Sequence, residues 1–351
     1  MSRRTRLFKA TLSALHFSGA DSMIAPLTRG VGAILALRRV QPPVPGDVTP
    51  NRTSKVTPEF LEQVIIQVGA SGFEVVSLDE AHFRLIEGDY RRPFICFTFD
   101  GAYRDTLQHA YPLFKRHNLP FTVYVATDHA DGNGDVWCQA LGEAIARTDR
   151  LSVKIDRVER AIRCDTRAAK EAAFTAVYRW LRTIEEVNAR GFVRDLCAST
   201  GYDPSQLCAE QMMGWDEIRQ LAADPLVTLG ARTRRHFALS RLPLGDVRAE
   251  IEESVRRLER ETGTPCRHFS YPYGDEPSAG PREFALVREL GLKTGVTGRT
   301  GLIHARHVGE LTSLPRIAVS GDYQKRRYLK VLLTGAPFAF FTAPAITSSA
   351  A

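Results

Sequence analysis

Short apolar runs alternate with amphipathic segments along most of this chain, and that alternation restricts its fold more than any other feature. Residues 32–37 read as a strand buried on both faces. Residues 57–70 follow as a helix, with Thr57 as its N-cap and Pro58 in its first turn. Further strands are expected at residues 73–77, 226–229, 267–271 and 292–296. The pattern predicts an α/β protein with a largely parallel, buried sheet.

The sharpest unit is a strand, loop, helix and strand over residues 94–125. The first strand, residues 94–99, ends at Asp100. A helix is expected at residues 104–117 and a second strand at residues 121–125. Polar residues at the carboxyl ends of parallel strands are where α/β folds build their sites. Asp100 is therefore predicted to lie in a functional site.

Composition excludes several classes of protein. The chain has 351 residues, 47 Lys and Arg against 40 Asp and Glu, and a net charge of +7 that is spread along the sequence, which predicts a solvated surface. The basic run at residues 325–327 is too short for a nucleic-acid patch, and the apolar run at residues 31–37 is too short for a membrane span. The six cysteines form no Cys-x-x-Cys pair, which favours a soluble, cytoplasmic protein. No feature indicates an oligomeric state.

Three ordered segments resemble the motifs of a known family. They are Phe-Thr-Phe-Asp-Gly-Ala-Tyr-Arg-Asp at residues 97–105, Gly-Ala-Arg-Thr-Arg-Arg-His at residues 230–236 and Arg-His-Phe-Ser-Tyr-Pro-Tyr-Gly-Asp at residues 267–275. The chain resembles the polysaccharide deacetylases, carbohydrate esterase family four, which include the nodulation-type chitooligosaccharide deacetylases. The flanking segments at residues 215–218 (Trp-Asp-Glu-Ile) and 314–317 (Leu-Pro-Arg-Ile) are typical of one bacterial branch.

The resemblance implies an incomplete (β/α) barrel over residues 30–335. A charged, helical insertion interrupts this barrel at about residues 137–213. Residues 1–29 form an N-terminal helical segment in this interpretation, and residues 336–351 a partly disordered tail rich in small residues.

In the resembled family, one Asp and two His hold a divalent, zinc-type metal that polarises the N-acetyl carbonyl. An amide is a poor electrophile, so a Lewis acid takes up oxyanion charge while a carboxylate accepts the water proton. The resemblance implies that Asp100 is the base, that Arg267 orients it and that the Tyr273 backbone N–H binds the oxyanion. Tyr271 and Pro272 would shape a turn that lines a sugar groove.

Two of the three expected metal ligands are absent. Gly101 replaces the second Asp of the first motif and Arg232 replaces the first His of the second motif, so only His236 remains. A guanidinium does not coordinate metals in this setting, and one imidazole does not hold a catalytic cation tightly. The net charge of the set is nevertheless preserved at +1. We therefore expect the Arg232 guanidinium to lie in the place of the cation and to pair with Asp100.

Other candidate ligands are less distinctive. Residues 38–39 are Arg-Arg where the family branch often has His. The family's general acid is not recognisable, and Glu310 is the candidate for its neighbourhood. His304 and His307, three residues apart in a loop, are interpreted as structural, and Asp105 as a residue that caps or orients.

Three functions remain open from the sequence. The first is hydrolysis of the N-acetyl amide of sugars or polysaccharides, with Asp100 as base and His236 as a residual ligand. The second is a catalytically silent relative that binds glycan or a glycan-synthesis partner, with Arg232 in place of the metal. The third is a metal-independent amide or ester hydrolase in which Arg232 binds the oxyanion. Gly101 and Arg232 are the residues that discriminate among them.

Overall fold

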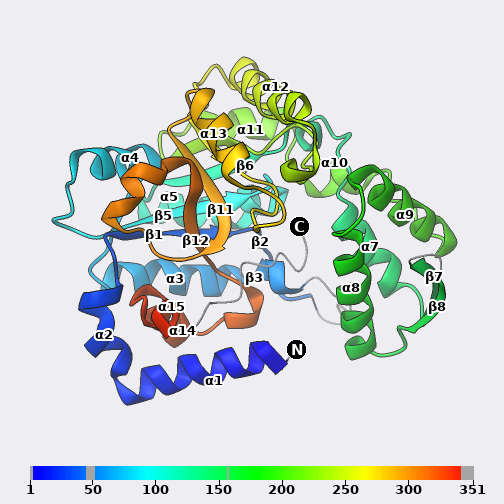
Figure 1. The fold of residues 1–351 in the computed structure, drawn as a ribbon, viewed down its shortest axis with the longest axis horizontal. Helices are drawn as coiled ribbons and strands as arrows, with labels where there is room; N and C mark the ends of the chain where they lie inside the picture. The colour runs from blue at the N-terminus through cyan, green and yellow to red at the C-terminus, as the bar shows by residue number, and fades with distance from the viewer. Residues whose placement is uncertain (1–2, 45–51, 156–157, 341–351) are drawn as a thin grey trace.

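Seven parallel strands close into a ring in the computed structural model, which describes residues 3–44, 52–155 and 158–340 (Figure 1). β5 pairs with β1 from Gly32 opposite Phe94 to Leu37 opposite Phe99, and this pairing closes the ring. A complete barrel of this type has eight strands, so the predicted incomplete (β/α) barrel is confirmed. Around the ring the strands are β1 (Gly32–Leu37), β12 (Leu314–Ala318), β11 (Thr294–Thr300), β10 (His268–Ser270), β9 (Val227–Ala231), β6 (Phe121–Val125) and β5 (Phe94–Asp100).

Helices cover the outside of the ring, and α3 is among those that the sequence predicts. Thr57 caps α3 (Pro58–Ala70) as predicted, because its Oγ1 accepts a hydrogen bond from the Phe60 N–H at 3.1 Å. The predicted strand at residues 73–77 is only β4 (Glu74–Val75), which pairs with the start of β5. The other outer helices are α4 (Leu78–Glu87), α5 (Tyr111–His117), α11 (Trp215–Ala222), α12 (Leu244–Thr262), α13 (Pro281–Glu289), α14 (Arg326–Leu333) and α15 (Ala336–Phe340).

The helix after Asp100 departs from the expected regular α-helix. Thr106–Ala110 forms a π-helical turn, in which the Tyr111 N–H donates to the Thr106 carbonyl, and α5 begins only at Tyr111. Pro112 has no N–H to donate to a preceding carbonyl, so the regular hydrogen-bond ladder cannot run through this point. Such π-bulges are frequent at functional sites.

The insertion at residues 137–213 is mixed rather than purely helical. It contains a hairpin of β7 (Arg150–Ile155) with β8 (Val158–Arg163) that the sequence interpretation missed. β8 is largely exposed and polar, so it lacks the apolar run that marks a buried strand. The helices are α7 (Trp137–Ala146), α8 (Arg167–Leu181), α9 (Glu186–Ser199) and α10 (Leu207–Gln211), and the whole insertion packs beside the barrel, drawn in green in Figure 1.

The predicted N-terminal helical segment consists of α1 (Arg3–Ser18) and α2 (Ala20–Thr28). Of the predicted tail, residues 336–340 form α15, and residues 341–351 lie outside the described residues. All six cysteines are buried as free thiols. Within the described ranges, no helix combines the length and apolar character that crossing a bilayer requires.

Candidate functional site

The polar residues of the site lie at the carboxyl ends of neighbouring barrel strands. Asp100 is the last residue of β5, Arg232 follows β9 and Ser270 ends β10. Arg316 reaches the same place from the middle of β12. The parallel ring brings these side chains together although they are far apart in sequence, and all are buried. The strand-end position predicted for Asp100 is therefore where the structure has it.

Asp100 is held by two arginines and a serine. Arg316 binds it in a bidentate manner, with Nη1 3.0 Å from Oδ1 and Nη2 2.8 Å from Oδ2. Arg232 Nη1 lies 2.9 Å from Oδ1, so the ion pair expected from the sequence is present, and Ser270 Oγ donates to Oδ1 at 3.0 Å. Burial alone raises the pKa of Asp100, but Arg232 and Arg316 hold it well below its usual range. Asp100 is therefore a buried anion fixed in one orientation.

The assignment of Arg267 as the residue that orients Asp100 was wrong. Arg267 precedes β10 at the amino-terminal edge of the ring, its side chain is 50% exposed, and its Nη1 lies 3.7 Å from Asp79 Oδ1. Arg316 orients Asp100 instead. A sequence signal existed for it, because an arginine in the middle of an apolar strand is buried and needs an acidic partner.

Arg232 also forms a hydrogen bond with His236, the one remaining ligand of the family pattern. Its Nε donates to His236 Nε2 at 3.1 Å, which uses the lone pair that a metal would need. Burial lowers the pKa of His236 well below its usual value, and the Arg232 charge lowers it further, so the ring is neutral. Burial lowers the pKa of Arg232 to about 10, so it stays protonated at neutral pH. The Arg232 guanidinium thus contacts both Asp100 and His236.

The residues at the three positions of the family's metal ligands, Gly101, Arg232 and His236, do not fit a divalent metal. Gly101 has no side chain, and its φ of +103° is one that other residues rarely adopt. A Cβ added there would lie 3.0 Å from the Tyr103 ring. Over the ranges that the structure describes, no group of three His, Cys, Asp or Glu side chains could hold an ion. With Nε2 of His236 already bonded, the chain keeps no ligand set at the site.

Glu310, the candidate for the general acid's neighbourhood, does not lie at the site. Glu310 is exposed in the segment Ala305–Ser313, which leads into the amino-terminal start of β12 and is therefore at the opposite end of the barrel from Asp100. His304 and His307 lie in the same region, where the His304 N–H donates to His307 Nδ1 at 2.9 Å. The placement of Glu310 near the site was wrong, and the two histidines bond to each other.

Residues of the third motif lie partly in the hydrophobic core and partly beside the site. Tyr271 does not line a groove as expected: it is fully buried between Phe269 and Phe284, and its hydroxyl donates to a backbone carbonyl. The Pro272 carbonyl accepts from the Gly274 N–H at 2.6 Å, which is the turn that the sequence predicted. Tyr273 has a φ of +61°, and its ring meets the His236 ring edge-on with centroids 5.2 Å apart. Only Tyr273 of these aromatic residues therefore borders the site.

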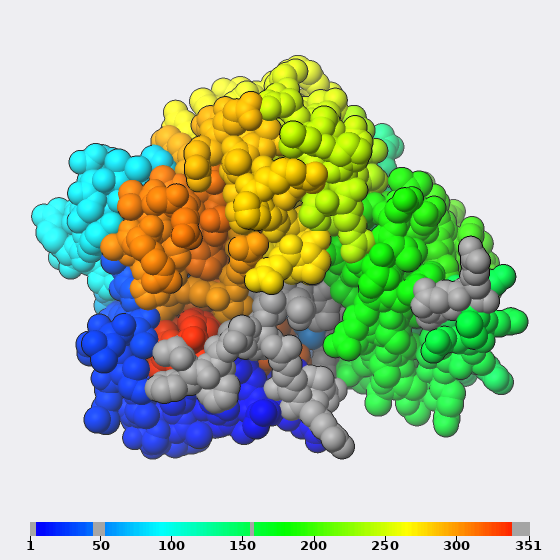
Figure 2. All heavy atoms as spheres, viewed as in Figure 1, coloured from blue at the N-terminus to red at the C-terminus, as the bar shows by residue number. Residues whose placement is uncertain are grey.

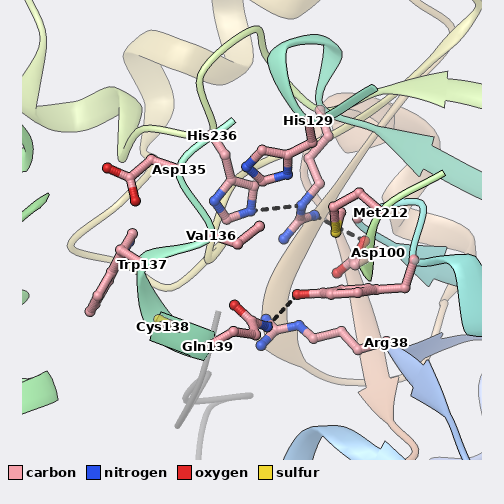
Figure 3. Close-up of a pocket in the computed structure, with 13 residues that line it drawn as sticks. Arg38, Asp100, His129, Asp135, Val136, Trp137, Cys138, Gln139, Met212 and His236 are labelled. Atoms are coloured by element: carbon pink, nitrogen blue, oxygen red, sulfur yellow. Dashed lines mark hydrogen bonds and ion pairs between the residues drawn. The ribbon is translucent and has the colours of Figure 1, made fainter. Parts of the chain in front are cut away.

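The site contains a small pocket of about 20 Å³, which holds roughly one water molecule. Asp100, Arg232 and His236 line it from the barrel, and residues 135–139 line it from the side of the insertion. Figure 3 shows Trp137 and Gln139 on the left and lower side of the view, and His129 and His236 side by side near the top. A sugar ring does not fit this pocket.

Buried hydrogen bonds hold the insertion on the barrel. Trp137 Nε1 donates to the Tyr273 hydroxyl at 3.0 Å, and Gln139 Nε2 donates to the Tyr103 hydroxyl at 2.5 Å. Arg190 of α9 also donates to the His236 carbonyl at 3.2 Å. We call the Trp137 and Gln139 bonds the seam. They fix the start of α7 over the strand ends and limit the space at the site.

Two further residues line the site: Arg38, which the sequence marked only as a departure from the family's His, and His129, which sequence reasoning missed. Arg38 directly follows β1, and His129 lies in α6 (Thr127–Ala130), directly after β6. The strand-end rule that identified Asp100 applies equally to both. Burial lowers the pKa of His129 to about 3, and the Arg190 and Arg232 charges contribute. His129 and His236 are thus two neutral, buried imidazoles beside one another.

These two histidines make stability depend on pH in a defined direction. Their pKa values in the folded chain lie below the value near 6.5 of the unfolded chain. The unfolded state therefore binds more protons, and stability falls as the pH drops below about 6.5. The free energy of unfolding should fall between pH 6.5 and pH 5. Replacing His129 with leucine should make this fall about 2 kcal/mol smaller. Urea unfolding at the two pH values measures this, and an unchanged fall would show that His129 is protonated when folded.

Fold and site together define a (β/α)-barrel protein whose polar site lies at the carboxyl ends of its strands. Residues 87–295, more than half of the chain, match the model of the family described as polysaccharide deacetylase. The chain belongs to the polysaccharide deacetylase family. No curated protein matches the sequence significantly.

Solved structures of deacetylases share the fold. Deacetylase PplD of Streptococcus pyogenes, solved in complex with acetate, superimposes with a TM-score of 0.57 at 14% identity, over 86% of this chain and 97% of that one. IcaB from Ammonifex degensii gives 0.53 at 16% identity, over 86% and 97%. BC0361, a polysaccharide deacetylase from Bacillus cereus, gives 0.54 at 12% identity, over 86% and 68%. At these identities the likeness concerns the fold alone.

Proposed function

We propose that this chain is a member of the polysaccharide deacetylase family that has lost metal-dependent N-deacetylation and keeps a carbohydrate ligand. The observation that carries the proposal is the position of the Arg232 guanidinium, bonded to Asp100 on one side and to His236 Nε2 on the other. Asp100, the base of the family pattern, and His236, its remaining ligand, are thereby both bonded to Arg232.

The electrostatics of Asp100 support the loss of hydrolysis. A general base is most effective when its pKa lies near the working pH. Two arginines hold the pKa of Asp100 well below its usual range, and three hydrogen-bonding partners occupy its oxygens. The carboxylate is therefore a weak base, with Oδ1 bonded to three partners and Oδ2 bonded to Arg316. Without a Lewis acid, the amide carbonyl also stays unactivated.

The carbohydrate part of the proposal rests on family membership and requires the seam to open. A sugar ring binds only to molecules in which the seam is open. The apparent affinity is therefore the intrinsic affinity multiplied by the fraction of molecules with an open seam. Replacing Trp137 with phenylalanine and Gln139 with alanine removes both seam bonds, each contributing about 1 kcal/mol. We expect this double variant to bind N-acetylglucosamine oligomers up to about 30-fold more tightly. Isothermal titration calorimetry measures the change.

A matched control for the seam is Ser152→Ala, which removes an exposed hydrogen bond to Glu159 within the hairpin of the same insertion. This control should bind like the parent chain. Equal affinity of the parent and the seam variant would contradict opening at α7. Absence of any oligomer binding by either protein would remove the carbohydrate ligand from the proposal.

Acetate release from N-acetylglucosamine oligomers tests the catalytic part. The parent chain should release no acetate above the blank, with added zinc or with a chelator. Release that the chelator abolishes would establish the family's metal mechanism and overturn the proposal. Release that the chelator leaves unchanged and that Arg232→Lys abolishes would instead establish a metal-independent hydrolase.

A further inference from the structure

The surplus positive charge of the chain is concentrated on two helices that pack together. α1 and α14 contact each other although they lie at opposite ends of the sequence. Together they carry seven Lys and Arg and no Asp or Glu. Removing those seven from the 47 basic residues leaves 40, which equals the 40 acidic residues. The expectation of a spread surplus was therefore wrong: the remainder of the chain is neutral by count, and this helix pair carries the net +7.

The most exposed apolar side chains lie in the same part of the molecule. Among the large apolar residues in the described ranges, the four with the highest exposure are Leu27 at 88%, Met23 at 82%, Phe17 at 75% and Leu7 at 67%. The first two are on α2 and the others on α1. Soluble surfaces carry scattered apolar residues, but their concentration beside basic side chains marks an interaction site.

Exposed apolar residues of α1 lie next to a basic side chain of α14. Leu7, Ala10, Ala14 and Phe17 are exposed positions at helical spacing and so form one stripe along α1. The Arg327 guanidinium of α14 lies 5.5 Å from the centre of the Phe17 ring. Asp21, the acidic residue of α2, is buried at 1% exposure. Figures 1 and 2 show α1 along the lower edge of the molecule and α2 rising from its end.

We propose that α1, α2 and α14 form a docking face for an anionic phospholipid bilayer. A helix that lies in a membrane interface buries apolar side chains at the headgroup boundary and places Lys and Arg against anionic lipids. The exposed residues Leu7, Phe17, Met23 and Leu27 supply the first element. The described basic side chains of α1 and α14 supply the second, namely Arg6, Lys9, Arg326, Arg327 and Lys330. This face is separate from the Asp100 site and does not depend on the function proposed for it.

Charge and side-chain chemistry favour a bilayer over other partners. A symmetric dimer through this face would set two basic surfaces against each other, and like charges at an interface are repelled. Nucleic acid would pair with the arginines and lysines, but three of the four exposed apolar side chains, Leu7, Met23 and Leu27, are not aromatic and offer no stacking surface for bases. Lipid is the partner that accommodates both the charge and the aliphatic groups.

Vesicle co-sedimentation with the full chain tests the proposal. We expect binding to vesicles of equimolar phosphatidylcholine and phosphatidylglycerol, and much weaker binding to phosphatidylcholine alone. Arg326→Gln with Lys330→Gln, both exposed, should weaken partitioning to the anionic vesicles about 30-fold. Met23→Ser with Leu27→Ser should also weaken it at least tenfold, because both side chains would leave the apolar boundary.

Matched controls distinguish an effect of this face from a general effect of net charge or of exposed apolar groups. Arg160→Gln with Arg179→Gln changes the net charge equally at exposed positions on β8 and α8, and Val187→Ser with Ile86→Ser removes exposed apolar groups elsewhere. Both should bind like the parent chain. Equal losses in test and control variants would overturn the proposal, as would absence of vesicle binding. A dimer that Met23→Ser with Leu27→Ser dissociates in light scattering, or DNA binding in place of vesicle binding, would also overturn it.

Discussion

Asp100→Asn is expected to lower the free energy of unfolding by about 3–5 kcal/mol, because it leaves Arg232 and Arg316 buried without their shared counter-charge. Both arginines are at most 2% exposed, so solvent cannot take over the role of the carboxylate. Urea unfolding at pH 7 measures the loss. The pairing of Asp100 stabilises the fold above the ordinary carboxyl pKa near 4, and this contribution is lost as the pH falls.

Asp216→Asn is the matched control, since the Asp216 side chain is 98% exposed and its pair with Arg219 is superficial. Its effect should stay within about 0.5 kcal/mol. Arg232→Met in the Asp100→Asn background should recover part of the loss, since it removes one of the two unpaired cations. A cost for Asp100→Asn as small as that of the control would contradict the buried arginine clamp.

The second large effect is a gain of metal binding by Gly101→Asp with Arg232→His. The first change supplies a carboxylate and the second an imidazole, and loss of Arg232 frees His236 Nε2. One Asp and two His then form a three-ligand set of the kind that holds catalytic zinc. We expect zinc to bind with a dissociation constant of about 1 μM or tighter, equivalent to about 8 kcal/mol. Titration calorimetry on the dialysed variant measures it.

The backbone at residue 101 limits this gain. Because Gly101 has a φ of +103° and little space beside Tyr103, an aspartate requires the loop to shift. Arg232→His alone should therefore bind zinc more weakly than the double variant and more tightly than the parent. Adding His236→Gln to the double variant should remove the gain. A folded double variant that binds no more zinc than the parent would show that these positions do not converge on one ion.

The sequence was sufficient for those parts of the site that local motifs specify. The strand ending at Asp100 is visible as an apolar run, and Arg232 was recognisable by its departure from a metal-binding pattern. Its pairing with Asp100 was expected because the net charge matches that of the resembled family's metal set. Arg267 was misplaced because the motif gives its type but not the edge of the barrel on which it lies.

Other features depend on contacts between distant segments. Arg316 lies 216 residues from Asp100, and only the closed ring of strands brings them together. The seam from Trp137 and Gln139 depends on how the insertion folds back over the strand ends. The basic helix pair was invisible for the same reason, since residues 3–18 and 326–333 become neighbours only in the folded chain.

The metal content of the purified chain tests most directly whether Arg232 has replaced the cation. The protein would be loaded with zinc, manganese or cobalt, dialysed, and analysed by elemental mass spectrometry beside its His236→Ala variant. We predict that both retain far less than one ion per chain and do not differ. One tightly held ion per chain in the parent, lost in His236→Ala, would contradict the replacement of the metal by Arg232.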